Sequence, residues 1–178
     1  MTQGDPKNPK KNPHPVKRYE VTATADAPGP WDSVKGYLGY EVVNKECTPE
    51  DKFLGVHELP PAVTLNFEMT KVDEKTWKGY IYSDLIQDED YYGLGVCHWK
   101  VTGVGPEFAV HGETFTSSDT LDVYLHKSPQ TEYFKKSEFL NRSLSGDGAL
   151  VSSADNPKVL QHPDDFFPIT VTVKEVKP

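Results

Sequence analysis

The residues best suited to chemistry lie together between Tyr82 and Trp99. This stretch holds four carboxylates, three tyrosines, a histidine and a tryptophan around one cysteine. Aromatic side chains among charges can anchor a protein partner inside a polar rim. We therefore interpret the stretch as a partner-binding loop and predict that its contact residues are Asp84, Asp88, Glu89, Asp90, Tyr91, Tyr92 and His98.

Calcium binding is one alternative use of these carboxylates. The run Asp88-Glu-Asp-Tyr-Tyr-Gly93 matches the first half of an EF-hand loop. The bidentate glutamate that such a loop needs at its twelfth position would fall on Trp99, and no helical pattern flanks the run. The six histidines also lack the spacing of a zinc site. We predict no metal and no cofactor.

Catalysis is a second alternative. Two of the same carboxylates could act as general acid and base of a glycoside hydrolase if an aromatic wall such as Tyr91 or Tyr92 kept one of them protonated. The chain contains no GxSxG elbow, and its scattered histidines do not indicate a catalytic triad. We predict a binding protein and not an enzyme, with an envelope hydrolase acting on carbohydrate or peptide as the alternative.

The two cysteines, Cys47 and Cys97, indicate the compartment. Their separation of 50 residues excludes a CxxC redox or zinc motif. A single disulfide between them fits an oxidising compartment, and two structural thiols in a cytosolic protein are the alternative. We predict the disulfide and a periplasmic or otherwise exported protein. The export signal is expected outside this sequence, because no apolar signal-peptide segment follows Met1.

Composition narrows the class of partner. The chain has 178 residues, of which 36% are hydrophobic, so a single folded domain is expected. The formal net charge of −8 argues against nucleic acid and anionic membranes, which both attract clustered lysine and arginine. No apolar run is long enough to span a bilayer. We predict a basic protein partner.

Residues 1–15 differ from the rest of the chain. They are rich in proline, lysine and asparagine and hold almost no apolar side chain that could enter a core. We predict a disordered, semi-extended tether there, followed by a single β-rich domain over residues 16–178. The tether resembles the spacer after the lipidated cysteine of a bacterial lipoprotein, which implies a lipid-tethered N-terminus in the native form.

From Val16 onward the hydrophobic residues alternate with polar ones, as in half-buried strands. The clearest case is Val63 to Thr70, and Asp73-Glu-Lys75 is expected to turn it into a second strand at Thr76–Ser83. Turn signals separate the segments. Further strands are predicted from Val16 to the turn at Ala27, at Tyr37–Val43, Gly95–Thr102, Phe108–His111, Leu121–His126 and Ile169–Val176. We predict an all-β fold, a mainly antiparallel β-sandwich or barrel-like sheet.

The alternation stops between Lys127 and Pro168. Serine, asparagine, aspartate and glycine dominate this stretch, with one short helix predicted at Thr131–Asn141. We expect a long irregular excursion, either functional or simply a solvated insertion.

The segment Tyr82-Ser-Asp, together with Asp88-Glu-Asp-Tyr-Tyr-Gly-Leu-Gly-Val-Cys-His-Trp99, resembles sequences of small exported proteins of Gram-negative bacteria. This group includes immunity proteins against antibacterial toxins. The resemblance implies a β-rich periplasmic protein, often tethered to a membrane, that blocks a toxin by binding it. A structural lipoprotein of the cell envelope is the remaining alternative.

Overall fold

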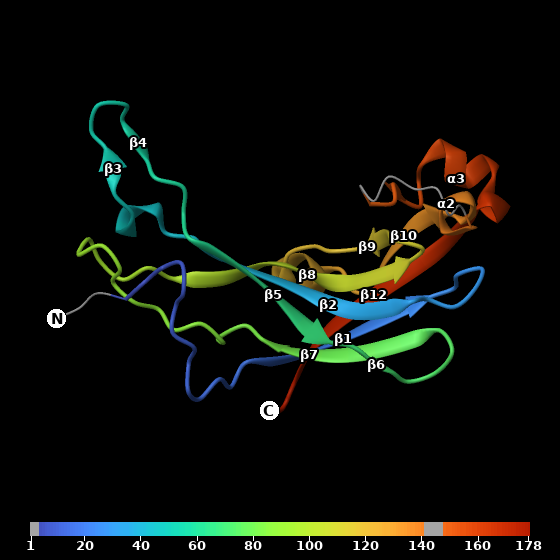
Figure 1. Ribbon diagram of the computed structural model, residues 1–178, viewed down its shortest axis with the longest axis horizontal. Helices are drawn as coiled ribbons and strands as arrows, with labels where there is room; N and C mark the ends of the chain where they lie inside the picture. The colour runs from blue at the N-terminus through green and yellow to red at the C-terminus, as the bar shows by residue number, and fades with distance from the viewer. Residues whose placement is uncertain (1–3, 141–147) are drawn as a thin grey trace.

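Two antiparallel β-sheets form the body of the protein as a sandwich (Figure 1). The structure is a computed structural model and describes residues 4–140 and 148–178. The first sheet contains, in spatial order, β11 (Val151–Ser152), β10 (Gln130–Lys135), β12 (Phe166–Val176), β1 (Arg18–Ala25), β7 (Thr76–Tyr82) and β6 (Thr70–Lys71). The second contains β5 (Ala62–Glu68), β2 (Ser33–Val42), β8 (Trp99–Val110) and β9 (Glu113–Thr116). The predicted all-β, mainly antiparallel fold is confirmed.

One hydrophobic core lies between the sheets, and the alternation of the strands builds it. In β1, Val21 and Ala23 are fully buried, and Val21 lies opposite Val173 of β12. From the second sheet, Leu38 of β2 and its neighbour Val104 of β8 enter the same core. The edge strand β5 alternates half-buried apolar residues with exposed neighbours, as predicted. The alternation of apolar and polar residues along each strand therefore decides which of its faces is buried.

An arm projects from the body of the sandwich (Figure 1). We use this name for residues 45–60, which contain the short helix η1 (Lys45–Cys47) and the two-stranded sheet of β3 (Glu50–Asp51) and β4 (Val56–His57). The arm lies in the connection between β2 and β5, which pair with each other up to Glu41 and Ala62. It is therefore a long insertion into an ordinary β-hairpin.

The segment Leu121–His126 is helix α1, so the prediction of a strand there is wrong. The Thr120 hydroxyl accepts a hydrogen bond from the backbone N–H of Val123 at 3.2 Å, which caps the helix. Leu121 and Tyr124 are buried, and their spacing of three residues places both on one face of a helix. The apolar alternation that predicted a strand leaves Tyr124 out, and burial of this large ring outweighs it.

Strand β8 joins two segments that were predicted as separate strands, Gly95–Thr102 and Phe108–His111. Pro106 lies within it, directly before Glu107, where the pairing with β9 begins. A proline is tolerated at such a boundary because it breaks no continuous ladder on that side. Before β8, the residues up to His98 belong to the preceding loop and not to a strand.

The predicted irregular excursion between Lys127 and Pro168 contains regular elements, so this prediction is wrong for its described part. β10 pairs with β12 from Gln130 opposite Val171 onward, so the helix predicted at Thr131–Asn141 is wrong up to Lys135 and is confirmed over Lys136–Leu140 (α2). The pairing with β12 makes a strand of a stretch that shows no alternation of its own. A further helix is α3 (Pro157–Gln161), followed by the turn η2 (Pro163–Asp165). Residues 141–147 of the excursion lie outside the described residues.

The described helices are short, and none has the length and apolar character that a membrane span requires. α2 and α3 lie together at the end of the molecule opposite to the arm (Figure 1). The arm and the helices α2 and α3 therefore lie at opposite ends of the sandwich (Figure 1).

Candidate functional site

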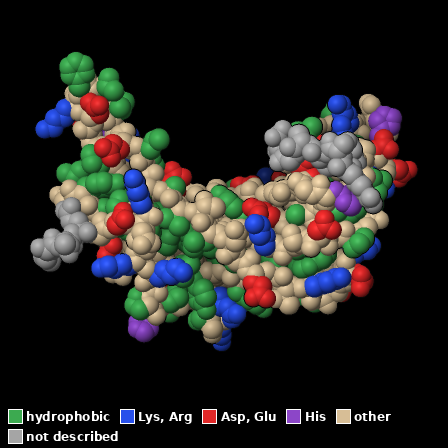
Figure 2. Space-filling model, viewed as in Figure 1, with side chains coloured by type: hydrophobic (Ala, Val, Ile, Leu, Met, Phe, Trp, Pro, Cys, Tyr) green, Lys and Arg blue, Asp and Glu red, His purple; other side chains and the backbone are tan. Residues whose placement is uncertain are grey.

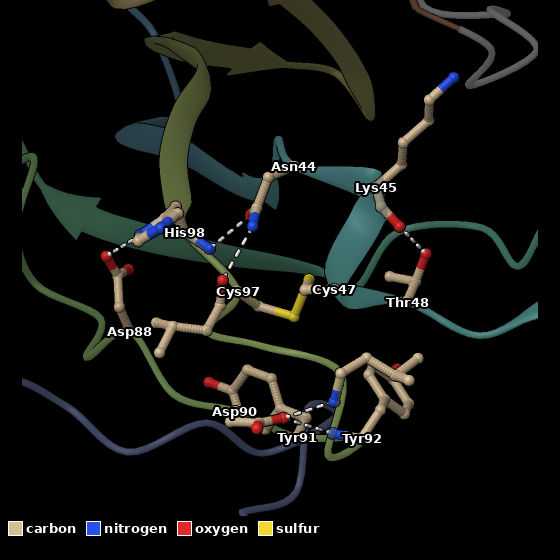
Figure 3. The surroundings of a disulfide bond; sticks show 12 residues. Asn44, Lys45, Cys47, Thr48, Asp88, Asp90, Tyr91, Tyr92, Cys97 and His98 are labelled. Carbon is tan, nitrogen blue, oxygen red and sulfur yellow. Dashed lines mark hydrogen bonds and ion pairs between the residues drawn. A yellow bond between two sulfur atoms is a disulfide. The ribbon is translucent and has the colours of Figure 1, made fainter.

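A disulfide between Cys47 and Cys97 joins the base of the arm to the loop that precedes β8 (Figure 3). The predicted disulfide is confirmed, with a Cα–Cα distance of 5.3 Å. Both cysteines are buried and form a small second core with Val42 and Tyr91. We call residues 84–98 the acidic loop. The arm and the acidic loop are thus parts of one covalently closed end of the sandwich.

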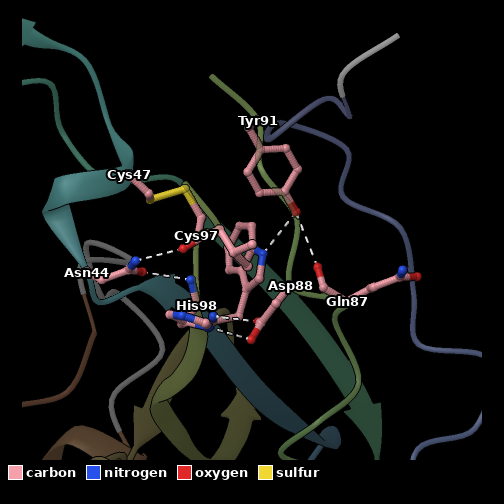
Figure 4. Close-up of polar contacts among 9 residues, drawn as sticks. Asn44, Cys47, Gln87, Asp88, Tyr91, Cys97 and His98 are labelled. Atoms are coloured by element: carbon pink, nitrogen blue, oxygen red, sulfur yellow. Dashed lines mark hydrogen bonds and ion pairs between the residues drawn. A yellow bond between two sulfur atoms is a disulfide. The ribbon is translucent and has the colours of Figure 1, made fainter. Parts of the chain in front are cut away.

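Asn44 reinforces this junction through its side-chain amide (Figure 4). Its Nδ2 donates to the carbonyl of Val96 at 2.8 Å, and its Oδ1 accepts from the N–H of His98 at 2.7 Å. The N–H of Val43 also donates to the carbonyl of His98 at 3.0 Å. The backbone on both sides of Cys97 is therefore fixed to the chain that enters the arm.

The acidic loop carries the predicted contact residues, and the structure turns most of its carboxylates toward the protein itself. Asp88 lies 2.9 Å from Nδ1 of His98 through one oxygen and accepts the N–H of Trp99 at 3.0 Å through the other (Figure 4). Both side chains of the Asp88–His98 pair remain partly exposed. Asp88 therefore shapes the entry into β8 and still reaches the surface.

Asp90 folds the tip of the loop. Its Oδ1 accepts backbone N–H groups from Gly93 at 2.6 Å, Leu94 at 3.2 Å and Tyr92 at 3.3 Å (Figure 3). A carboxylate that satisfies consecutive backbone donors stabilises a tight turn. Gly93, with φ of 75°, supplies the left-handed backbone that this turn needs. The likeness to an EF-hand thus reflects a turn. No group of three or more potential metal-ligating side chains gathers anywhere in residues 4–140 and 148–178.

Asp84 holds a second segment, residues 10–17, which we call the strap. Its two carboxylate oxygens accept the N–H of Val16 at 2.9 Å and of Lys17 at 3.0 Å. Further along, the N–H of Asn12 donates to the carbonyl of Leu85 at 2.7 Å. The strap includes the last part of the predicted disordered tether. From Lys10 onward this part is paired with the acidic loop, because the loop offers it carboxylate and carbonyl acceptors.

Glu89 also faces the strap. Its Oε1 forms an ion pair with Lys10 at 3.6 Å, and its Oε2 is buried without a hydrogen-bond partner among the described residues. The N–H of Gln87 donates to the carbonyl of Lys10 at 2.9 Å. Lysine of the predicted tether therefore neutralises part of the charge that was expected to meet a partner.

Tyr91 and Tyr92 of the acidic loop are buried to different degrees. Tyr91 is only 4% exposed, and burial raises the pKa of its hydroxyl, with Glu89 and Asp88 adding to the effect. Burial likewise raises the pKa of Tyr92, with smaller contributions from Glu58 of the arm and Asp5. The expected contact role of Tyr91 requires an exposed ring, and the ring instead packs in the small core around the disulfide.

The arm carries the most exposed apolar side chains of this end, and sequence reasoning missed it. Phe53 is 97% exposed, Leu59 91% and Leu54 69%, and apolar side chains cluster at the arm's tip (Figure 2). The base is ordered by buried Thr48, whose hydroxyl donates to the Lys45 carbonyl at 2.6 Å. The sequence carries one signal for this arm: the adjacent apolar residues Phe53 and Leu54, followed by Gly55, come directly after the polar run Glu50-Asp51-Lys52.

The fold and this end together define an antiparallel β-sandwich-like domain with a disulfide-braced loop and a projecting arm. Comparison with protein-family models, curated proteins and solved structures gives no match to the chain. The function is therefore argued from the geometry of this end.

Proposed function

We propose that the protein is an exported binding or inhibitor protein that recognises a basic protein partner with its disulfide-braced end. The observation that carries the proposal is the arm, which projects from the sandwich and carries exposed apolar side chains and exposed carboxylates (Figures 1 and 2). An immunity protein that blocks an antibacterial toxin or enzyme in the periplasm is the form of this function that we favour. The disulfide supports an oxidising compartment.

The charge of the arm supports a basic partner. Residues 45–60 contain four carboxylates and two lysines. Glu46, Glu50 and Glu58 are exposed, and no ion pair of the described residues involves them. Free surface charges of this kind steer an oppositely charged partner and raise its association rate. The carboxylates of the acidic loop contribute to the same field, although most of them also hold the loop together.

The hydrolase alternative has less support from the geometry. Asp84 and Asp88 line a groove of about 650 Å³ next to Trp99. Both carboxylates accept backbone N–H bonds, which is the arrangement of a structural acid. The structural-lipoprotein alternative has no feature of its own here. We therefore keep the binding function as the single proposal.

Affinity capture from an envelope extract of the native organism tests the proposal. The baits are the wild type, Glu50→Lys/Glu58→Lys in the arm, and the matched control Glu74→Lys/Glu175→Lys, which makes the same change of charge at exposed sites elsewhere. We expect one stoichiometric partner with the wild type and the control, and its loss with the arm variant. Capture of the same partner by all three baits, or of none, would overturn the proposal.

A further inference from the structure

We propose that the arm is an apolar plug, in which Phe53 and Leu54 enter an apolar pocket of the protein partner and the surrounding carboxylates meet basic side chains at the rim of that pocket. This inference rests on the proposed function and specifies the partner's chemistry.

The exposure of the tip indicates that these side chains have a task outside the chain. Phe53 and Leu54 are adjacent; Phe53 is 97% exposed, more than any other large apolar side chain of the described residues, and Leu54 beside it is 69% exposed. Neither belongs to a hydrophobic cluster of residues 4–140 and 148–178. Single exposed apolar residues are common, but adjacent ones at the end of a projecting hairpin form a compact contact surface. A phenylalanine ring in such a position is a typical anchor for a pocket.

The tip is also ordered before any partner binds. Asp51 Oδ1 accepts the N–H groups of Phe53 at 2.9 Å and of Leu54 at 3.1 Å, and the Asp51 carbonyl accepts the N–H of Gly55 at 2.7 Å. Gly55 has a φ of 67°, which closes the turn without strain. Because the turn is already formed, its backbone has little conformational entropy to lose on binding, and the remaining cost is that of the two side chains.

The charges around the tip favour a pocket of a partner protein over two other possible contacts of the tip, an anionic bilayer and a second copy of this chain. Glu50, Asp51 and Glu58 outnumber Lys52, so an anionic bilayer would repel the arm. A second copy of the chain would bring the same carboxylates together, and the net charge of −8 opposes that contact. A pocket with a basic rim satisfies both the apolar tip and its acidic surroundings.

The test uses the full chain with Phe53→p-benzoylphenylalanine, photocrosslinked in the envelope extract and mapped residue by residue by mass spectrometry. In parallel, the captured partner is purified and its Kd is measured for the wild type, for Phe53→Ser/Leu54→Ser, and for the matched control Val72→Ser/Leu160→Ser at exposed sites of the body. Equal thermal unfolding of the three proteins verifies that the changes leave the fold intact.

We expect crosslinks to residues that line an apolar pocket of the partner, and binding at least about thirtyfold weaker for the tip variant with the control unchanged. Crosslinks to a flat polar surface, to phospholipid or to another copy of this chain would overturn the plug. Equal affinity of the tip variant and the wild type would overturn it while leaving the proposed function standing. Absence of a partner with every bait would instead overturn the proposed function and this inference with it.

Discussion

The indole N–H of Trp99 donates a 3.0 Å hydrogen bond to the hydroxyl of Tyr91. Trp99 begins β8 and Tyr91 lies in the acidic loop, so the bond ties the loop to the sheet. The two rings also meet edge to face, with their centroids 6.2 Å apart. The acidic loop is therefore stabilised by the packing of Tyr91 against Trp99, although Tyr91 was predicted to contact a partner.

Replacing Tyr91 with phenylalanine keeps the ring and removes this acceptor, together with the hydrogen bond that the hydroxyl donates to the Gln87 carbonyl at 3.4 Å. The Trp99 N–H then loses a part-buried hydrogen bond, and we expect the free energy of unfolding to fall by about 1–2 kcal/mol. Urea denaturation measures the change. Tyr80→Phe, which removes only an exposed hydroxyl 3.3 Å from Glu20, serves as the control. A Tyr91→Phe protein as stable as this control would contradict the structural role of the bond.

Asp90→Ala is expected to loosen the tip of the acidic loop. Three backbone N–H groups lose their common acceptor, so amide exchange at residues 92–94 should accelerate while the β-sheets stay protected. Asp90→Asn should have a smaller effect, because its carbonyl oxygen still accepts hydrogen bonds. Exchange measured by mass spectrometry or NMR compares the two variants. Unchanged exchange in Asp90→Ala would show that the turn forms without this carboxylate.

Removal of the disulfide tests how the braced end is maintained. The bridge closes a loop with a sequence separation of 50 residues, and the chain-entropy model assigns about 4 kcal/mol of stability to a loop of this length. We expect Cys47→Ser/Cys97→Ser to lower the Tm strongly. A reductant should lower the Tm of the wild type and leave that of the variant unchanged. Equal unfolding of the two proteins under oxidising conditions would refute this expectation.

Asp84→Ala is expected to release the strap. The amide protons of Val16 and Lys17 should then exchange faster, since each loses its carboxylate acceptor. Asp26→Ala, which removes an exposed ion pair with Lys75 elsewhere on the surface, is the control and should leave these amides protected. Persistent protection in Asp84→Ala would show that the strap is held by its other contacts, such as the backbone hydrogen bonds of Asn12 with Leu85 and of Lys10 with Gln87.

The pH dependence of stability should depend in part on Glu132 of β10. Burial raises the pKa of this carboxyl, and the nearby charge of Asp119 adds to the effect, partly offset by a hydrogen bond with Ser117. The folded state therefore favours the protonated form, so the contribution to stability is present at low pH and is lost as the pH rises through the raised pKa. We expect Glu132→Gln to raise the Tm at pH 7.

That gain should disappear below the ordinary carboxyl pKa of 4.5, where glutamate is protonated in both states. Thermal unfolding at pH 7 and pH 4 measures it, with Glu175→Gln at an exposed position as the control. A gain of the same size at both pH values would attribute the effect to hydrogen bonding of the amide and not to the charge.

Alternating apolar residues were sufficient to predict the long strands β1, β2, β5, β7, β8 and β12, because period two decides which side chains the sheet buries. The same rule failed at Leu121–His126, where one capping bond from Thr120 and the burial of Tyr124 favour a helix. It also missed β10, whose conformation depends on pairing with β12, a distant segment. Local patterns do not contain such long-range partners.

The candidate site was predicted in composition but not in orientation. The sequence shows that acids and aromatics gather around Cys97, and the disulfide followed from the presence of two cysteines. The sequence does not show that Asp84 and Asp90 accept backbone N–H groups of neighbouring segments, because these hydrogen bonds depend on how the chain folds. The arm was not predicted, because two adjacent apolar residues in a connection do not by themselves indicate a projecting tip. The exposure of Phe53 and Leu54 is known only from the structure.

The position of the arm also bears on how the protein could change over generations. The pairing of Glu41 with Ala62 closes the β2–β5 ladder at the arm's base, so changes beyond that rung leave the register of the sheet intact. The entropic penalty of a longer connection grows slowly with its length. Provided that Cys47 is kept, the residues at the tip of the arm can be replaced or extended while the sandwich stays unchanged. Under the proposed function, the choice of partner can then diverge without a new fold.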